Sequence, residues 1–241
     1  MKGLFTFLLL AGFGTGSHAQ LSDLVGAWKY ESGDTTIALI ITNGHFAETT
    51  YSLKNKTFIS TAGGSWSTQN GHFRKLYEFS SNKPELVGQK VSFYYHEEVK
   101  GKLGMVEEST QKKKEFTIID NGAPGKLAGA WLITGRMQGG SLQSITPGAR
   151  RTMKILSGTR FQWIAYNTDT KEFLGTGGGT YTTENGKYTE NIEFFSRDNS
   201  RVGASLTFDF SLEDGNWRHK GLSSKGDPID EVWTKREKIG L

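Results

Sequence analysis

The side chains best suited to bind a small molecule lie in the last third of the chain. One stretch alternates a face that carries Phe161 and Trp163 with a face that carries Arg160, Gln162 and Tyr166. Because neighbouring side chains of a strand point to opposite sides, one of these faces is expected to line the interior of a barrel. Aromatic surface with a few guanidinium groups suits an amphipathic anion, such as a fatty acid, or a charged sugar. The alternative is that both rings only fill the core.

A charged loop and a histidine extend this candidate site. The loop Ser196–Arg201 lies between two predicted strands, where barrels often carry recognition residues. His219 lies on a predicted strand and resembles the lone histidine that holds haem in some barrels, although a histidine in the core or on the strand surface is the default. The residues expected to contact a ligand are therefore Arg160, Trp163, Tyr166, Arg197, Arg201 and His219.

No pattern in the sequence predicts a catalytic residue, a metal ligand or a cofactor site. The chain has no Cys, which excludes thiolate metal sites and cysteine nucleophiles. The glycine-rich stretch Thr176–Tyr181 lacks the Lys-Ser/Thr and the helix of a phosphate-binding loop, so a bend in a strand is the simpler interpretation. Adjacent carboxylates such as Asp230 and Glu231 point to opposite faces of a strand. Acidic residues and histidines from distant strands could still meet inside a barrel.

The elements that position these residues belong to an internal repeat. Residues 161–208 match residues 46–93 at an offset of 115 without a gap, and the match includes the glycine-rich pair Thr61–Trp66 and Thr176–Tyr181. Turn-forming dipeptides separate short β-branched and aromatic runs, for example at Asn185-Gly186. Tight turns and eight strands per copy favour closed barrels over Greek-key sandwiches. We therefore expect an all-β fold with two tandem antiparallel up-and-down β-barrel repeats of about eight strands each.

The N-terminus has the pattern of a cleaved signal peptide. Lys2 precedes the apolar run Leu4–Phe13, and Ser17-His18-Ala19 places small residues where a signal peptidase reads them. No Cys follows, so a lipid anchor is not expected, and no later segment is apolar enough to cross a membrane. The expected location is therefore secreted or periplasmic.

The remaining residues divide into two repeats. We expect a signal peptide over residues 1–19, the first barrel over 20–120, a linker over 121–126 and the second barrel over 127–241. The formal net charge of +4 is mild, and together with export it argues against a nucleic-acid partner.

The heads of both copies carry a Gly-x-Trp motif, in Leu24–Trp28 and Leu127–Trp131. In this motif and in the predicted meander the chain resembles the lipocalin-like, or calycin, proteins, and as a whole it looks like a family of tandem lipocalin-like secreted proteins of Bacteroidetes. The resemblance implies two ligand-enclosing barrels with structural roles for Gly26, Trp28, Gly129, Trp131 and Arg236. It also implies that Arg236 packs on the opening tryptophan of its barrel. The first copy has no arginine at the matching place, near Lys112–Phe116.

These observations favour an exported soluble protein that binds a small amphipathic or anionic ligand, a lipid or a sugar acid, in its second barrel. The alternative is a structural or interaction module with filled barrels that docks an envelope protein or a glycan. A calycin-type enzyme and a haem binder are further alternatives. The volume of the barrel separates the first two hypotheses, because a carrier needs a cavity above ~300 Å³.

Overall fold

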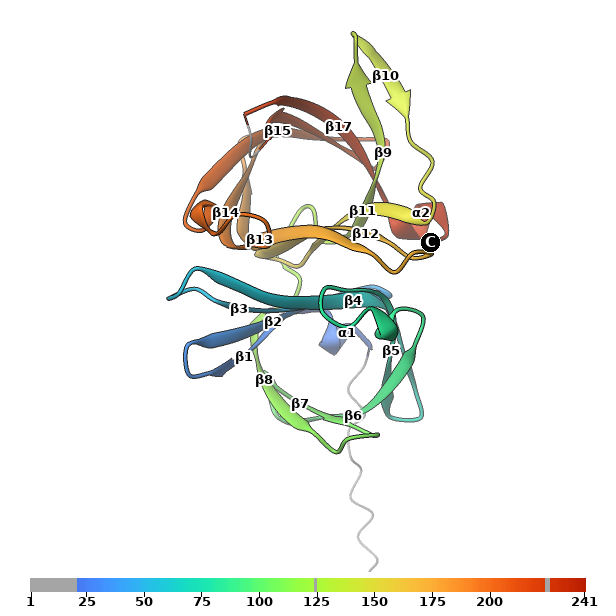
Figure 1. Cartoon of the computed structure of the whole chain (residues 1–241), viewed down its shortest axis with the longest axis vertical. Coiled ribbons are helices and arrows are strands. Elements are labelled where there is room, and N and C mark those ends of the chain that lie inside the picture. Colours follow the sequence, from blue (N-terminus) through green and yellow to red (C-terminus); the bar gives the residue numbers. More distant parts are fainter. Residues whose placement is uncertain (1–20, 124, 224–225) are drawn as a thin grey trace, which may run out of the picture.

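The computed structural model describes residues 21–123, 125–223 and 226–241 and contains two closed antiparallel barrels (Figure 1). The prediction of an all-β fold with two tandem eight-stranded barrels is confirmed. The predicted signal peptide lies outside the described residues. Short helices lie at the two ends of the described chain, α1 (Leu21–Leu24) and α2 (Arg236–Ile239).

The first barrel is a meander in which each strand pairs with the next and β1 closes the ring on β8. A short 3₁₀ turn, Pro84–Leu86, separates β5 from β6. The strands are β1 (Gly26–Ser32), β2 (Thr35–Thr42), β3 (His45–Ser52), β4 (Thr57–Gln69), β5 (His72–Ser80), β6 (Lys90–Val99), β7 (Lys102–Glu107) and β8 (Lys113–Asp120).

The second barrel repeats this order and closes through pairing of β9 with β17. The second copy also contains β10, which pairs only with β9 among the described strands and projects from the barrel as a hairpin (Figure 1). A 3₁₀ turn, Asn199–Arg201, follows β14. The strands are β9 (Gly129–Gln138), β10 (Ser141–Ser144), β11 (Arg150–Leu156), β12 (Arg160–Asn167), β13 (Phe173–Glu184), β14 (Lys187–Phe195), β15 (Ser205–Glu213), β16 (Asn216–Leu222) and β17 (Pro228–Lys235).

Glycine-rich bulges bend the longest strand of each barrel. The pairing of β4 with β5 shifts register between Gly63 and Gly64, and the pairing of β13 with β14 shifts between Gly178 and Gly179. Such bulges sharpen the local twist, which a small barrel needs in order to close. The glycine-rich stretch of the second copy is therefore a barrel bend, as its sequence predicts.

Each barrel opens with a glycine and a buried tryptophan. Gly26 and Gly129 adopt φ angles of +139° and +137°, a region that disfavours side chains. The indole nitrogen of Trp28 donates to the carbonyl oxygen of Leu24 at 3.0 Å, and Trp131 donates to Leu127 at 2.8 Å. Both tryptophans are at most 2% exposed. The two Gly-x-Trp motifs thus close one end of each barrel in the same way.

Arg236 does not have the role that the resemblance implies. The residue that places its charge over the ring of Trp131 is Lys235, whose ammonium lies 5.4 Å from the ring centroid. Arg236 directs its guanidinium to Glu78 of the first barrel, at 2.9 and 3.1 Å. The difference arises because β17 ends at Lys235, so Arg236 begins α2 beside the other barrel.

The barrels pack against each other through equivalent residues. Tyr51 donates to Glu193 at 2.6 Å, and Tyr166 donates to Glu78 at 2.7 Å. Each of these tyrosines and glutamates lies 115 residues from its counterpart, so the same contact occurs twice across an approximate two-fold axis. The rings repeat this symmetry, because Tyr51 contacts Phe194 and Tyr166 contacts Phe79 with centroids 5.0 Å apart in both pairs.

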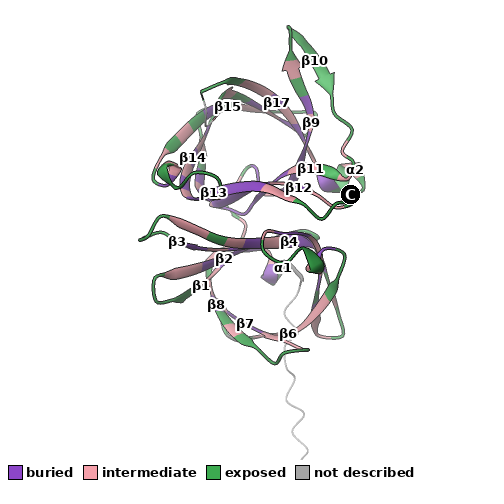
Figure 2. Ribbon diagram, in the orientation of Figure 1, coloured by how far each residue is buried: buried purple, intermediate pink, exposed green. Residues whose placement is uncertain are grey.

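A buried polar network lies near this axis. The side-chain amide nitrogen of Gln162 donates to Thr61 at 2.9 Å and to its equivalent Thr176 at 3.0 Å, and the amide oxygen accepts from Thr49 at 2.9 Å. Apolar residues from both barrels surround this network, and β4, β12 and β13 carry buried stretches where the barrels meet (Figure 2). The interface therefore occupies one outer face of each barrel and fixes which side chains point inward.

Candidate functional site

The second barrel contains a cavity of about 590 Å³. This volume lies in the range of sites that enclose small organic molecules. The apolar wall comes from four strands, β12, β14, β15 and β17, and its residues are Trp163, Ile192, Phe195, Leu206, Phe208, Ile229 and Trp233. Arg136, Arg197 and Asp227, which are more exposed, also line the cavity. It is therefore an apolar chamber with charged groups where it meets solvent.

A buried ion pair lies in the wall of this cavity. Lys154 donates to Glu190 at 2.8 Å, and their side chains are only 6% and 5% exposed. The ammonium also lies 5.0 to 5.7 Å from the centroids of four aromatic rings, those of Tyr188, Phe208, Trp217 and Trp233. Contact with the negative faces of rings partly replaces the hydration that the ammonium loses on burial.

Glu231 is the second buried acid of the cavity. It accepts from Arg136 at 2.8 Å and from the indole nitrogen of Trp233 at 3.2 Å. Burial by itself raises the pKa of Glu231, but the neighbouring His219, Lys154 and Arg136 outweigh this effect and lower the pKa to about 2. The carboxylate is therefore ionised at neutral pH. The negative charges of Glu190 and Glu231 are balanced by the positive charges of Lys154 and Arg136.

His219 lies between these charges and is 2% exposed. Its Nδ1 is 3.5 Å from Glu231 Oε2, and neither ring nitrogen makes a hydrogen bond of acceptable geometry with the part of the chain that the structure describes. Burial and the charge of Lys154 lower the pKa of His219, in spite of the opposing carboxylates. The imidazole is thus neutral at neutral pH, with one nitrogen as donor and the other as acceptor.

Two differences between the repeats account for the space inside the second barrel. At the position of Ile192 the first barrel has Tyr77, whose ring packs on Phe46 with centroids 5.6 Å apart. Sheet register also places Met105 of the first barrel at the position of His219, because the two pair with Tyr95 and Phe210, which lie 115 residues apart. In the second barrel, a smaller side chain and a more polar one therefore stand where large apolar side chains pack the first barrel.

The interior of the first barrel is packed around its own buried charges. Lys75 is 2% exposed, pairs with Glu48 at 2.8 Å and lies within 5 Å of the ring centroids of Phe46 and Phe93. Lys114 also pairs with Glu48, at 2.8 Å. Burial raises the pKa of Glu48, but the two lysines outweigh it and lower the pKa to about 2. These ionic groups are satisfied within the barrel.

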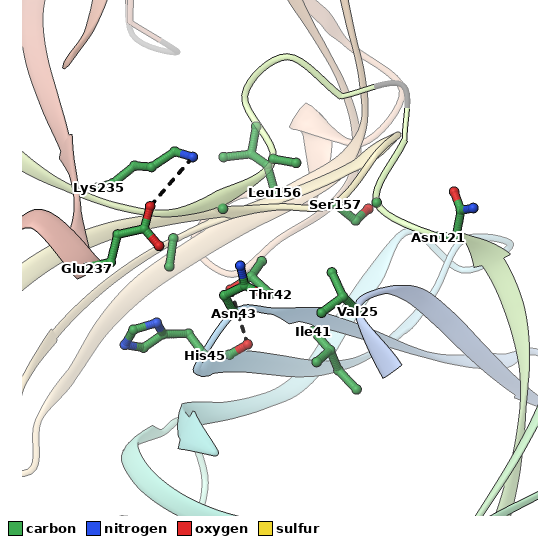
Figure 3. Close-up of a pocket in the computed structure, with 14 residues that line it drawn as sticks. Val25, Ile41, Thr42, Asn43, His45, Asn121, Leu156, Ser157, Lys235 and Glu237 are labelled. Carbon is green, nitrogen blue, oxygen red and sulfur yellow. Dashed lines mark hydrogen bonds and ion pairs between the residues drawn. The ribbon is translucent and has the colours of Figure 1, made fainter. Parts of the chain in front are cut away.

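A smaller hollow of about 190 Å³ lies between the barrels (Figure 3). Asn43 and His45 lie on one side of it, and Lys235 and Glu237, which form an ion pair at 3.8 Å, lie on the other (Figure 3). Its volume is below that of most sites for small organic ligands. We therefore place the candidate site in the second barrel.

The structure brings together three of the residues that the sequence singles out. Trp163, Arg197 and His219 all line the cavity of the second barrel. Arg197 also donates to the carbonyl oxygen of Leu174, which holds the side chain beside the glycine-rich bend. The assignment of these residues to ligand binding remains a prediction.

The other three predicted site residues lie elsewhere. Arg160 points out of the barrel into the interface, where it pairs with Glu193 and donates to Tyr51 at 2.9 Å. Tyr166 shares this outer face. Arg201 pairs with Asp198 at 3.2 Å in an exposed 3₁₀ turn. Of the two faces of β12, the one with Phe161 and Trp163 is the inner one.

Sequence reasoning missed Lys154, Glu190 and Glu231. Their signal is a single charged residue at an inward position of an alternating strand, as in Tyr188-x-Glu190-x-Ile192. Such a charge is costly in a core unless a partner meets it. Asp230 and Glu231 do point to opposite faces, as expected, and only Glu231 reaches the cavity.

Among the described residues, no group of three or more acidic, histidine or cysteine side chains is arranged to hold a metal ion. The described part of the chain also contains no helix of the length and apolar character needed to cross a bilayer. No protein-family model matches the chain, and no curated protein matches it significantly.

Proposed function

We propose that the chain is an exported, lipocalin-like carrier whose second barrel binds a small amphipathic molecule. The observation that carries this proposal is the cavity of about 590 Å³, which has an apolar wall and a small set of convergent polar groups. Membership of the tandem lipocalin-like proteins of Bacteroidetes, and export by a signal peptide over residues 1–19, belong to the same proposal. They are supported by the two Gly-x-Trp openings and by the apolar N-terminal run.

The first barrel would support the second. Its interior is occupied by packed rings and paired charges, and its outer face covers the strands that carry Lys154 and Glu190. The alternative hypothesis, an interaction module with two filled barrels, agrees with the packed first barrel but not with the chamber of the second. The carrier therefore accounts for both halves of the chain.

The proposal is tested with N-phenylnaphthylamine, a neutral amphipathic dye whose fluorescence rises in apolar surroundings. The wild-type protein is expected to bind the dye at one site. Ile192→Trp places a large ring in the cavity and should abolish binding. The control is Ile59→Trp, which adds the same ring at a position that is 48% exposed on the first barrel.

Dye binding that survives in Ile192→Trp, or its absence from the wild-type protein, would refute the carrier. Thermal unfolding of both variants confirms that they are folded. Native mass spectrometry of the protein purified from its host without detergent then identifies the natural ligand by its mass.

A further inference from the structure

A cluster of buried polar atoms without a well-aligned hydrogen-bond partner adjoins the candidate site. Five buried side-chain polar atoms of the described residues lack a hydrogen-bond partner of acceptable geometry. Four of them belong to Tyr188, Trp217 and His219: the tyrosine hydroxyl, the indole nitrogen and both imidazole nitrogens. Buried polar groups in folded proteins are nearly always paired, so a local concentration of unpaired ones indicates a role other than packing. We call these three residues the polar floor.

The polar floor is compact and adjoins the cavity. The ring centroid of His219 lies 5.3 Å from that of Trp217 and 5.8 Å from that of Tyr188, and the latter two lie 5.1 Å apart. All three side chains are at most 2% exposed. His219 lines the cavity, whereas Trp217 contacts the opening residue Trp131. The floor therefore separates the chamber from the packed end of the barrel.

The hydrogen-bonding capacity of the floor is mixed. The indole nitrogen of Trp217 can only donate, whereas the hydroxyl of Tyr188 and the neutral imidazole of His219 can each donate and accept. Burial and the neighbouring carboxylate of Glu190 raise the pKa of Tyr188 well above its usual value, so its proton is retained at neutral pH. A partner that satisfies the floor must both accept and donate.

The charges around the floor disfavour an ionic partner. A carboxylate would lie beside Glu190 and Glu231, and the carboxylate of Glu231 is already 3.5 Å from the imidazole. An ammonium group would face Lys154, whose nitrogen lies 5.0 Å from the rings of both Tyr188 and Trp217. Like charges in a poorly solvated site repel strongly. A neutral hydroxyl group meets neither penalty.

We propose that His219, the residue of the polar floor that lines the cavity, binds the hydroxyl group of an amphipathic alcohol whose hydrocarbon part occupies the apolar chamber. This inference rests on the proposed carrier function and specifies its ligand class. It differs from the anionic ligand that the arginines in the sequence suggest, because Arg160 faces the other barrel and the buried Lys154 is paired with Glu190. Trp163, Phe208 and Ile229 would then contact the hydrocarbon chain.

The experiment compares octanol, octanoate and octylammonium as competitors of N-phenylnaphthylamine at neutral pH. The three molecules share one hydrocarbon chain and differ in the charge of the polar group. Octanol is expected to displace the dye at the lowest concentration. The comparison on the wild-type protein needs no substitution, so it cannot fail through misfolding.

A variant then locates the hydroxyl group. His219→Met introduces the residue that the first barrel has at the same register position, and it should weaken octanol binding roughly tenfold through the loss of a hydrogen bond, while the dye still binds. Equal or better competition by octanoate or octylammonium, or unchanged octanol binding in His219→Met, overturns the inference and leaves the carrier in place. No dye binding to the wild-type protein refutes the carrier and the inference together.

Discussion

Several contacts between the barrels converge on Glu78, and its charge should be essential to stability. Its carboxylate accepts from Tyr166 at 2.7 Å, from Arg151 at 3.0 Å and twice from Arg236 at 2.9 and 3.1 Å. The side chain of Arg236 is 1% exposed, so water cannot replace the lost anion. In Glu78→Gln this guanidinium would remain buried without a counter-charge.

The expected cost is about 3–5 kcal/mol, the range measured when one partner of a buried ion pair is removed. The control is Asp209→Asn, which disrupts the exposed pair between Asp209 and Lys187. Both of its side chains are more than half exposed, so we expect a cost below about 1 kcal/mol. The difference between the two substitutions follows from the burial of Glu78 and from its larger number of charged partners.

Urea unfolding followed by far-ultraviolet circular dichroism measures both free energies of unfolding. A double variant, Glu78→Gln with Arg236→Met, should lose less than the sum of the two single losses, because it removes the unpaired charge as well. A loss below about 1 kcal/mol in Glu78→Gln, or additive losses in the double variant, would show that the pair is as weak as a surface one.

The pH dependence gives an independent check. Burial opposes ionisation of Glu78, but Arg236 and Tyr166 outweigh it and lower the pKa of the folded state. The stabilisation is therefore present above the unfolded pKa of ~4.3 and is lost as pH falls through the lower folded pKa. The gap in stability between the wild-type protein and Glu78→Gln should narrow below pH ~4.

Two further substitutions test the local geometry. Gly26→Ala should lower the free energy of unfolding by more than about 2 kcal/mol, because the added methyl would lie 2.1 Å from the carbonyl oxygen of Asp120 at a φ of +139°. The control is Gly33→Ala, whose methyl meets no atom within 4 Å and which should cost about 1 kcal/mol. Chemical denaturation compares them, and equal losses would contradict the steric explanation.

The sequence carries enough information to predict the architecture. Asn70-Gly71 and Asn185-Gly186 are turns with positive φ at both residues, so each fixes a hairpin and its register without help from distant contacts. The repeat then predicts the second barrel from the first. The hairpin of β10 is not predicted, because Ser141–Ser144 is too short and polar to show strand periodicity.

The site is harder to predict because both faces of its strands are buried. On β12, Phe161 lies inside the barrel and Gln162 lies in the interface, and both are at most 1% exposed. Alternation separates these faces but does not say which one points inward. The sequence therefore predicts that Arg160 binds the ligand, whereas in the structure it binds Glu193. The partners of Lys154 and Glu231 come from strands distant in sequence, which periodicity does not reveal.

Each barrel contributes both a tyrosine and a glutamate to the crossed contacts of the interface. Tyr51 and Glu78 lie on one barrel, and Tyr166 and Glu193 on the other, in matching places. Such a surface is self-complementary, so the chain has the architecture of a homodimer whose subunits are joined end to end. In a true homodimer, every substitution appears in both subunits. In the joined chain, a residue such as His219 can open one interior while the other stays packed, so covalent fusion lets one half retain stability and the other specialise.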